Sequence, residues 1–195
     1  MKLSTDELDR ITKFMLEAGK LKGIDRTGWV IHGVKRPEHV GDHSFSTALM
    51  SYIIALRMGL DAERCMAMAL IHDIPEAKVG DIATRADEKN QTVNNFDKKA
   101  LENKGMNEMK SLLDEESASR LCALWEELEM EKSQEARLVK QIDKLDYVLQ
   151  LVAYSQELSD AAADEFLETA GKKITIPEVR YIYDKIKATL SDMRK

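Results

Sequence analysis

Helix-breaking and aromatic residues are scarce in this sequence. Proline occurs three times and glycine nine times among the 195 residues, aromatic residues make up 6%, and one third of the residues are charged. This composition favours an all-α protein over one rich in strands and turns. A chain of this length can bury one core and one pocket. We therefore expect residues 1–195 to form a single globular, all-α domain.

Excess positive charge, long apolar runs and cysteine are also in short supply. The formal net charge is -6, which disfavours binding to a nucleic acid polymer, although a few local arginines could still hold an anionic small molecule. The longest apolar stretches, "ALMSYIIAL" and "CMAMALI", fall short of the roughly 20 residues of a membrane span. The first residues are too acidic for a signal peptide, and Cys65 and Cys122 are expected to be reduced thiols. We expect a cytoplasmic protein without a membrane partner.

Apolar residues recur at helical spacing along most of the chain. Helices are expected over residues 4–21, 42–56, 61–74, 115–130, 134–159 and 177–193. In the first two helices, the residues at this spacing are Leu8, Ile11, Met15, Ala18 and Leu21, and then Phe45, Leu49, Ile53 and Leu56. Residues 84–104 are poor in apolar side chains, and we expect a mobile connection with a short helix and no further role there; a lid over a pocket is the alternative.

Histidine marks the candidate chemistry. All four histidines precede residue 73: His32, His39, His43 and His72. In "ALIHDIPEAKVGD", His72 and Asp73 stand at the end of an apolar helical run, and Pro75 ends or kinks the helix just beyond them. Both side chains can therefore converge on one atom beyond the last helical turn.

A carboxylate also occupies a predicted core position. In "EARLVKQIDKLDYVLQL", Asp143 shares a helical column with Val139 and Tyr147. A charged group in this position is unfavourable unless it is paired or bound to a metal. A salt bridge to a neighbouring lysine or arginine is the alternative role for Asp143.

Five ordered motifs resemble one known family. The motifs "RTGWV", "RPEHVGDHS", "ALIHDIPEAKVGDI", "LWEELE" and "VKQIDKLD" are similar, in this order, to the 5′-deoxynucleotidase branch of the HD-domain metal-dependent phosphohydrolases. The resemblance covers about residues 8–185. It implies an all-helical HD domain that uses a metal-activated water to hydrolyse deoxyribonucleoside 5′-monophosphates to nucleoside and phosphate. It also implies one divalent transition metal per subunit and a homodimer.

The resemblance assigns the metal ligands as His43, His72, Asp73 and Asp143. Two imidazoles and two carboxylates suit Mn, Co, Fe, Ni or Zn, whereas Mg prefers oxygen ligands. No histidine follows His72, so the chain resembles the one-metal type of HD enzyme rather than a cyclic-dinucleotide phosphodiesterase.

Two further carboxylates match catalytic positions of the family. Glu76 matches a glutamate that handles a proton on the attacking water; its alternative is a solvated first-turn carboxylate that favours the helix dipole. Asp81 follows Gly80 and matches a position near the phosphate and sugar, where it could transfer a proton to the leaving oxygen or orient the sugar. Its alternative is capping of the next short turn. Further substrate contacts are implied for Asp73, Ile82, Ala83 and Thr84.

Arg26 and Trp29 match the substrate-side arginine and tryptophan of the family, with a two-residue offset from its compact Arg-Trp version. A guanidinium can bind phosphate bidentately, and an indole can position the phosphate or stack on the base. A surface arginine and a core tryptophan are the alternatives. Arg36 is a weaker phosphate candidate, His39 is expected at the surface, and His32 is assigned no role.

Two other functions compete with a nucleoside monophosphatase. An HD hydrolase of nucleoside triphosphates or guanosine polyphosphates would need more basic residues than those around the motifs, which are Arg26, Arg36, Lys78 and Arg85. A non-catalytic metal-binding helical module would not need Glu76 or Asp81. Both residues are present, and we therefore expect a nucleoside monophosphate as the substrate.

Overall fold

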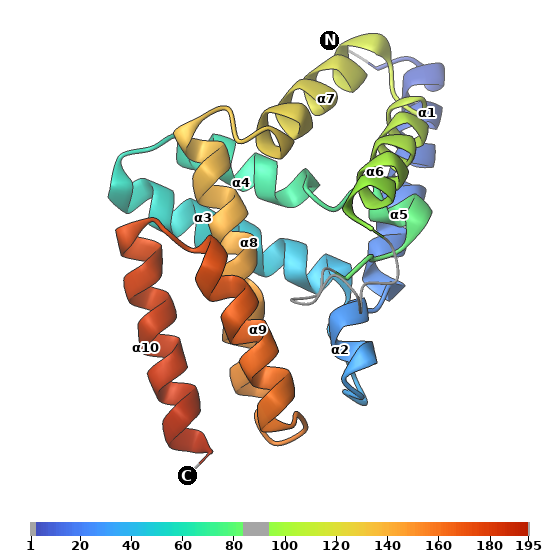
Figure 1. Cartoon of the computed structure of the whole chain (residues 1–195). Coiled ribbons are helices and arrows are strands. Elements are labelled where there is room, and N and C mark those ends of the chain that lie inside the picture. Colours follow the sequence, from blue (N-terminus) through green and yellow to red (C-terminus); the bar gives the residue numbers. More distant parts are fainter. Residues whose placement is uncertain (1–2, 84–93, 195) are drawn as a thin grey trace.

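Helices make up the architecture of the chain. The computed structural model describes residues 3–83 and 94–194, and within these ranges it contains an isolated β-bridge between Asp25 and His39 but no strand. The elements in Figure 1 are α1 (Thr5–Ala18), the 3-10 helix η1 (Gly19–Gly23), α2 (Thr27–Ile31), α3 (Val40–Met58), α4 (Ala62–Ile71), α5 (Glu76–Val79), α6 (Asn95–Lys110), α7 (Glu115–Glu129), α8 (Gln134–Ala153), α9 (Asp160–Lys173) and α10 (Pro177–Met193). The predicted all-α class is confirmed. Across the described ranges, no helix has both the length and the apolar character that crossing a membrane requires.

Local sequence signals set several of the helix ends. Ser4 and Glu7 form a reciprocal capping box at the start of α1, and Asp61 accepts a hydrogen bond from the backbone of Arg64 at the start of α4. α4 ends at Ile71, and a turn leads through Pro75 into α5. The helix break predicted near Pro75 is therefore confirmed.

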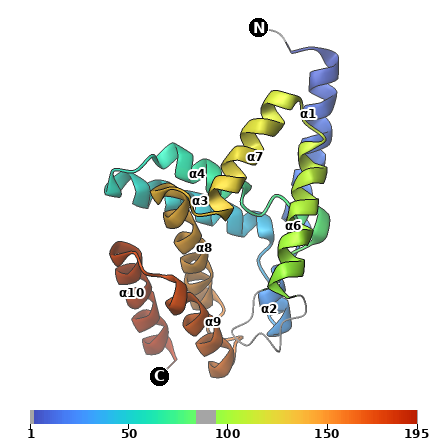
Figure 2. The ribbon, with the colours of Figure 1, turned by 45° about the horizontal axis from the view of Figure 1, so that its top comes forward.

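α8 is the central helix of the fold. It contacts α3, α4, α7, α9 and α10, and its inner face is fully buried in the main core through Leu138, Ile142, Leu145, Val148 and Leu151. Figure 1 shows α9 and α10 on one side of the molecule and α1, α5 and α6 on the other. Figure 2 shows α1, α6 and α7 extending together on that second side. α8 therefore lies between two helical groups and presents residues to the space between them.

α3 turns its large apolar side chains away from the core. Phe45 is 67% exposed, and Leu49, Ile53 and Leu56 are exposed by 52% to 53%. The buried residues of α3 are mostly small or polar: Val40, His43, Ser44, Thr47, Ala48, Ser51 and Ala55. Small residues allow α3 to pack closely against α4 and α8. The spacing thus predicts the helix correctly, but the large residues at that spacing do not form its core-facing side.

Two helical segments differ from the prediction. Residues 95–104 belong to α6, which packs against α5 and α7, so the helix expected within residues 84–104 is present but is longer than predicted and runs to Lys110. Residues 84–93 of the expected connection lie outside the described residues. The helix expected over residues 134–159 ends at Ala153, and a separate helix, α9, follows. Apolar periodicity misses α9 because its buried face is mostly alanine: Ala162, Ala163, Leu167 and Ala170.

α6 makes a close backbone contact at Gly105. A Cβ atom at this position would lie 2.6 Å from the carbonyl oxygen of Pro75. Pro75 stands in the turn between Asp73 and Glu76. The missing side chain at Gly105 therefore allows α6 to pack directly against the turn that carries two candidate site residues.

We predict that Gly105→Ala lowers the free energy of unfolding by about 1–3 kcal/mol, because the new methyl group overlaps the Pro75 carbonyl. In a helix, replacing glycine by alanine usually increases stability, because alanine is the better helix former. Here the close contact makes the same substitution destabilising. Gly19→Ala is the matched control, since a Cβ atom there meets nothing within 4 Å. Urea denaturation followed by circular dichroism measures both variants. A Gly105→Ala protein as stable as the parent would contradict the close contact.

Candidate active site

Four side chains from α3, the end of α4 and α8 converge on one point. Nε2 of His43 lies 3.2 Å from Nε2 of His72 and 3.2 Å from Oδ1 of Asp143. Oδ2 of Asp73 lies 3.1 Å from Nε2 of His72 and 3.8 Å from Nε2 of His43. His43, His72 and Asp73 thus offer ligand atoms within 4.8 Å of one another, and Asp143, the fourth residue predicted as a metal ligand, joins this group through its contact with His43.

Each of the two histidine rings is oriented by an acceptor on its other nitrogen. Nδ1 of His43 is 2.6 Å from Oδ2 of Asp146, and Nδ1 of His72 is 2.6 Å from the carbonyl oxygen of Ala69. These acceptors favour the tautomer with the hydrogen on Nδ1, so that a neutral ring directs its Nε2 lone pair at the shared point. Two such lone pairs together with two carboxylates form a donor set that fits a divalent transition metal. The sequence analysis missed Asp146.

The charges around His43 also favour a cation. Burial and the positive charge of Arg26 oppose protonation of His43, but Asp143 and Asp146 outweigh them and raise its pKa to about 9. A divalent cation at the same point would take the place of that proton. Burial would raise the pKa of Asp143, but Lys144 and His43 hold it well below its usual range. Nζ of Lys144 is 2.9 Å from Oδ2 of Asp143, so the predicted alternative salt bridge is present and leaves Oδ1 facing His43.

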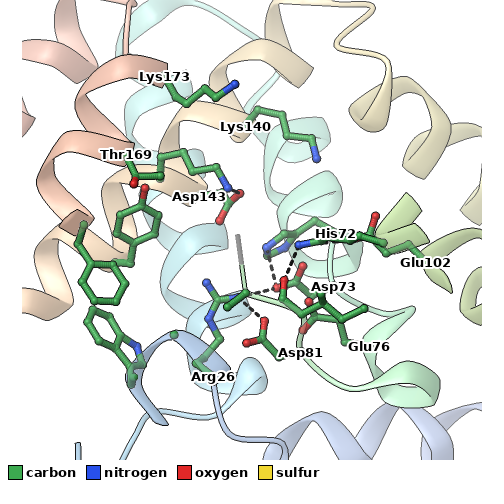
Figure 3. A pocket seen from close by; sticks show the side chains of 18 of the residues that line it. Arg26, His72, Asp73, Glu76, Asp81, Glu102, Lys140, Asp143, Thr169 and Lys173 are labelled. Carbon is green, nitrogen blue, oxygen red and sulfur yellow. Dashed lines mark hydrogen bonds and ion pairs between the residues drawn. The ribbon is translucent and has the colours of Figure 1, made fainter. Parts of the chain in front are cut away.

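A cavity of about 260 Å³ opens beside these residues. Figure 3 shows Arg26, Asp73 and Asp81 at one end and Lys140 and Lys173 at the other. Among the described residues that line the cavity, seven are carboxylic acids and five are basic. An anionic ligand would therefore meet net negative charge here, and a bound cation would favour its entry.

Arg26 and Asp81 lie in the cavity wall next to the four converging residues. Nη1 of Arg26 lies 3.4 Å from Oδ2 of Asp73 and 3.4 Å from Oδ1 of Asp81. The other carboxylate oxygen of Asp81 accepts a hydrogen bond of 2.5 Å from the backbone N–H of Thr27, in the first turn of α2. Gly80, at φ +76°, supplies the turn that precedes Asp81. Asp81 thus lines the cavity and accepts a hydrogen bond at the start of α2, whereas residues 84–93, which follow it, lie outside the described residues.

Glu76 is the buried carboxyl group of the cavity. It is 4% exposed, which contradicts the alternative of a solvated first-turn carboxylate. Burial, reinforced by the neighbouring Asp73 and Asp81, raises the pKa of Glu76 well above its usual range. Its Oε2 makes no hydrogen bond to any part of the chain that the structure describes. Glu76 is therefore suited to hold a proton at neutral pH and to contact a polar group in the cavity.

Trp29 is a core residue that also lines the cavity. It is 1% exposed, and its Nε1 donates a hydrogen bond of 2.8 Å to Oε1 of Glu38. Its ring lies 4.4 Å from the ring of Phe166, centre to centre. His32, for which no role was predicted, lines the same cavity. Ile82 and Ala83 line it as expected, whereas Thr84 lies outside the described residues.

Four lysines line the cavity, and the sequence motifs did not predict this position for any of them: Lys98, Lys140, Lys144 and Lys173. Three of them are paired with carboxylates. The distances from Nζ to the carboxylate oxygen are 3.6 Å for Lys98 and Glu102, 2.5 Å for Lys140 and Glu129, and 2.9 Å for Lys144 and Asp143. Of the basic residues counted around the motifs, Arg26 lines the cavity, Arg36 and Lys78 are not among its described lining residues, and Arg85 lies outside the described residues. Lys78 instead pairs with Glu17 at 2.7 Å.

Comparison with known proteins gives the family. The model of a family described as "HD domain" matches residues 18–180. The chain belongs to the HD domain family. The four converging residues of this HD domain lie inside the matched range.

Relatives of this HD domain include two proteins named "5'-deoxynucleotidase HDDC2". The zebrafish protein is 37% identical over 173 residues, which is 88% of this chain and 84% of the relative. The human protein is 35% identical over 182 residues, which is 93% of this chain and 86% of the relative. A solved "conserved hypothetical protein" from Pyrococcus furiosus is similar with a TM-score of 0.70 and 30% identity, covering 91% of this chain and 99% of that one. The resemblance to the 5′-deoxynucleotidase branch is confirmed.

We predict that Asp146→Asn weakens binding of Mn or Zn about 10- to 100-fold, because an amide can present its N–H₂ to His43 and favour the wrong tautomer. Isothermal titration of the metal-free HD domain measures the affinity, and circular dichroism checks the fold. Asp164→Asn, an exposed substitution on α9, is the control. Equal affinities of the two variants would show that Asp146 does not orient the His43 ring.

Proposed function

We propose that this protein hydrolyses nucleoside 5′-monophosphates, in particular 2′-deoxyribonucleotides, to nucleoside and phosphate. The observation that carries the proposal is the convergence of His43, His72, Asp73 and Asp143 beside a cavity that also contains Arg26. The names of the zebrafish and human relatives support the same reaction and the same substrate class.

The four converging residues would hold one divalent ion per subunit. Their mixture of imidazole and carboxylate favours Mn, Co, Fe, Ni or Zn over Mg. When bound, the ion would supply an activated water and polarise the phosphate. Asp73 would lie at the boundary between ion and substrate, because the same carboxylate also faces Arg26 at 3.4 Å.

The protein side chains divide the remaining tasks. Arg26 would bind phosphate oxygens, since a guanidinium offers paired donors to an oxyanion. Glu76 has a raised pKa, and its Oε2 has no hydrogen-bond partner among the described residues, so Glu76 would hold or move the proton of the reaction. Both carboxylate oxygens of Asp81 already face partners, Thr27 and Arg26. Asp81 is therefore better suited to orient Arg26 and the sugar than to transfer a proton.

A monophosphate fits the charges of the cavity better than a polyphosphate. Lys98, Lys140 and Lys144 are each paired with a carboxylate. They add little net positive charge for further phosphates, although they lie within the cavity wall. Lys173 is the fourth lysine of the cavity, so a triphosphate or guanosine polyphosphate would have to displace these ion pairs to meet a second lysine.

Phosphate release from a panel of nucleotides tests the proposal. The panel contains ribo- and deoxyribonucleoside mono-, di- and triphosphates, and the protein is stripped of metal and reloaded with Mn, Co, Zn or Mg. We expect metal-dependent release from monophosphates, with deoxyribonucleotides preferred. Release from triphosphates alone would contradict the substrate class, and no release by any metal-loaded form would favour a non-catalytic metal-binding module.

Two variants assign the measured activity to the site. Asp73→Ala is expected to abolish both metal binding and phosphate release, which also controls for a contaminating phosphatase. Glu76→Gln is expected to retain the metal and to slow turnover by roughly 10²- to 10⁴-fold, as typical for a lost acid–base group. Metal content and turnover are measured on the same preparations. Unchanged turnover of Glu76→Gln would remove Glu76 from proton transfer.

We also propose that the protein forms a homodimer. The exposed residues Phe45, Leu49, Ile53 and Leu56 lie along one side of α3. Contiguous apolar patches of this kind are uncommon on monomers. One stripe can pack against its copy about a two-fold axis, because such an interface is self-complementary.

Sedimentation velocity tests the dimer and its interface. Ile53→Lys is expected to shift the protein towards monomer at low micromolar concentration, because it places a charge within the stripe. Leu16→Lys on α1, where the native side chain is 70% exposed, is the matched control. A monomeric parent protein would contradict the dimer, and dissociation by Leu16→Lys alone would place the interface elsewhere.

The two cysteines support a reducing, cytoplasmic setting for this activity. Both are free, Cys65 buried and Cys122 half-buried. Burial, with a smaller contribution from Glu135, raises the pKa of the Cys65 thiol to about 12, so its reactive thiolate form is rare. Free thiols are typical of proteins in reducing compartments.

A further inference from the structure

Tyr147 carries a buried hydroxyl group that forms no hydrogen bond with the described residues. The residue is 8% exposed and lines the cavity. Its oxygen is buried and makes no hydrogen bond within residues 3–83 and 94–194. A buried polar group without a partner is unfavourable by about 1–3 kcal/mol, and such groups are rare in folded proteins. A ligand in the cavity could supply the missing partner.

Tyr147 belongs to an aromatic wall that begins beside Arg26. Its ring lies 5.7 Å from the ring of Phe166 on α9, and the ring of Phe166 lies 4.4 Å from that of Trp29 on α2. Trp29, Phe166 and Tyr147 all line the cavity. These three rings form an apolar wall of the cavity for the flat parts of a nucleoside, and the Tyr147 hydroxyl is a buried polar group within that wall.

The place of Tyr147 along α8 relates it to the sugar of the substrate. It follows Asp143 by four residues, which is one helical turn or about 6 Å along the helix axis. The reacting phosphate would lie at Asp143 and Arg26. The sugar is attached directly to that phosphate, whereas the base is farther away, so the sugar hydroxyls are the first donors and acceptors that a residue one turn away can meet.

The hydroxyl of Tyr147 remains protonated under ordinary conditions. Burial, reinforced by the negative charge of Asp143, raises the pKa of Tyr147 above its usual range. A neutral phenol both donates and accepts hydrogen bonds, and this suits a sugar hydroxyl, which does the same.

We propose that Tyr147 is a specificity-determining residue that forms a hydrogen bond with the 3′-hydroxyl of the nucleotide sugar. This inference rests on the proposed function, because it takes the 5′-phosphate to lie at the four converging residues. It adds the α8–α9 side of the cavity to the recognition of the sugar, beside Asp81, while Arg26 and the metal centre act on the phosphate.

A comparison of two substrates in two proteins tests the inference. The substrates are a 2′-deoxynucleoside 5′-monophosphate and the 2′,3′-dideoxy analogue with the same base, and the proteins are the parent and Tyr147→Phe, both loaded with the same metal. We expect the parent to prefer the deoxynucleotide roughly 3- to 10-fold in kcat/KM, the size of one neutral hydrogen bond. In Tyr147→Phe this ratio should fall towards one.

Two controls show whether a changed substrate ratio comes from lost stability or from removal of any tyrosine hydroxyl. Tyr147→Phe should be at least as stable as the parent, because the lost hydroxyl has no partner among the described residues. Tyr181→Phe, at a residue that is 64% exposed on α10, should keep the parent's substrate ratio. Equal ratios in the parent and Tyr147→Phe would overturn the inference. A parent without preference for the 3′-hydroxyl would overturn it without any variant.

A wrong proposed function can be distinguished from a wrong role for Tyr147. If the metal-loaded parent releases phosphate from no nucleotide, the proposed function is wrong, and binding then decides the inference. Isothermal titration would compare a 2′-deoxynucleoside with its 2′,3′-dideoxy analogue in the parent and in Tyr147→Phe. A selective loss of the deoxynucleoside's advantage in Tyr147→Phe would support the contact, and equal affinities in both proteins, or no binding of either nucleoside, would overturn it.

Discussion

Buried negative charge between α3, α4 and α8 is the constraint on which this structure depends. Asp146 on α8 faces Nδ1 of His43 on α3, whereas Asp143 on α8 and Asp73 after the end of α4 both face Nε2 of the same imidazole. Carboxylates so close together in a core are unfavourable unless a positive charge lies among them. A cation bound at this point would therefore link the three helices, and its binding free energy would also stabilise the fold.

The same surroundings shift the pKa values of neighbouring carboxyl groups in opposite directions. Lys144 and His43 hold the pKa of Asp143 well below its usual range, whereas burial and the nearby Asp73 and Asp81 raise the pKa of Glu76 well above its usual range. Enzymes that use acid–base chemistry commonly separate the pKa values of adjacent groups in this way. Here the difference in pKa between Asp143 and Glu76 comes from their positions. Glu76 lines the cavity, and its Oε2 has no hydrogen-bond partner among the described residues.

Sequence alone predicts the residues whose role is determined by a local pattern. His72, Asp73 and Pro75 are adjacent, so their grouping at a helix end follows from helix geometry, and Asp143 is conspicuous as a charge in an apolar column. Lys98 and Glu102 give no such signal, because α6 reaches the cavity only through tertiary packing. Apolar spacing likewise identifies α3 as a helix but not its buried side, because close packing selected small residues for that side.

The turn after α4 is held in place by two residues, one on α6 and one on α7, that do not line the cavity. Gly105 packs on Pro75 from α6, and Nε1 of Trp125 on α7 donates a hydrogen bond of 3.3 Å to the backbone oxygen of His72. Mutational tolerance should consequently be low in parts of α6 and α7 that look like ordinary scaffold. Substitutions at these positions would change the distances between the proposed metal ligands without replacing a ligand. The outer helices α6 and α7 could therefore alter the chemistry of the site.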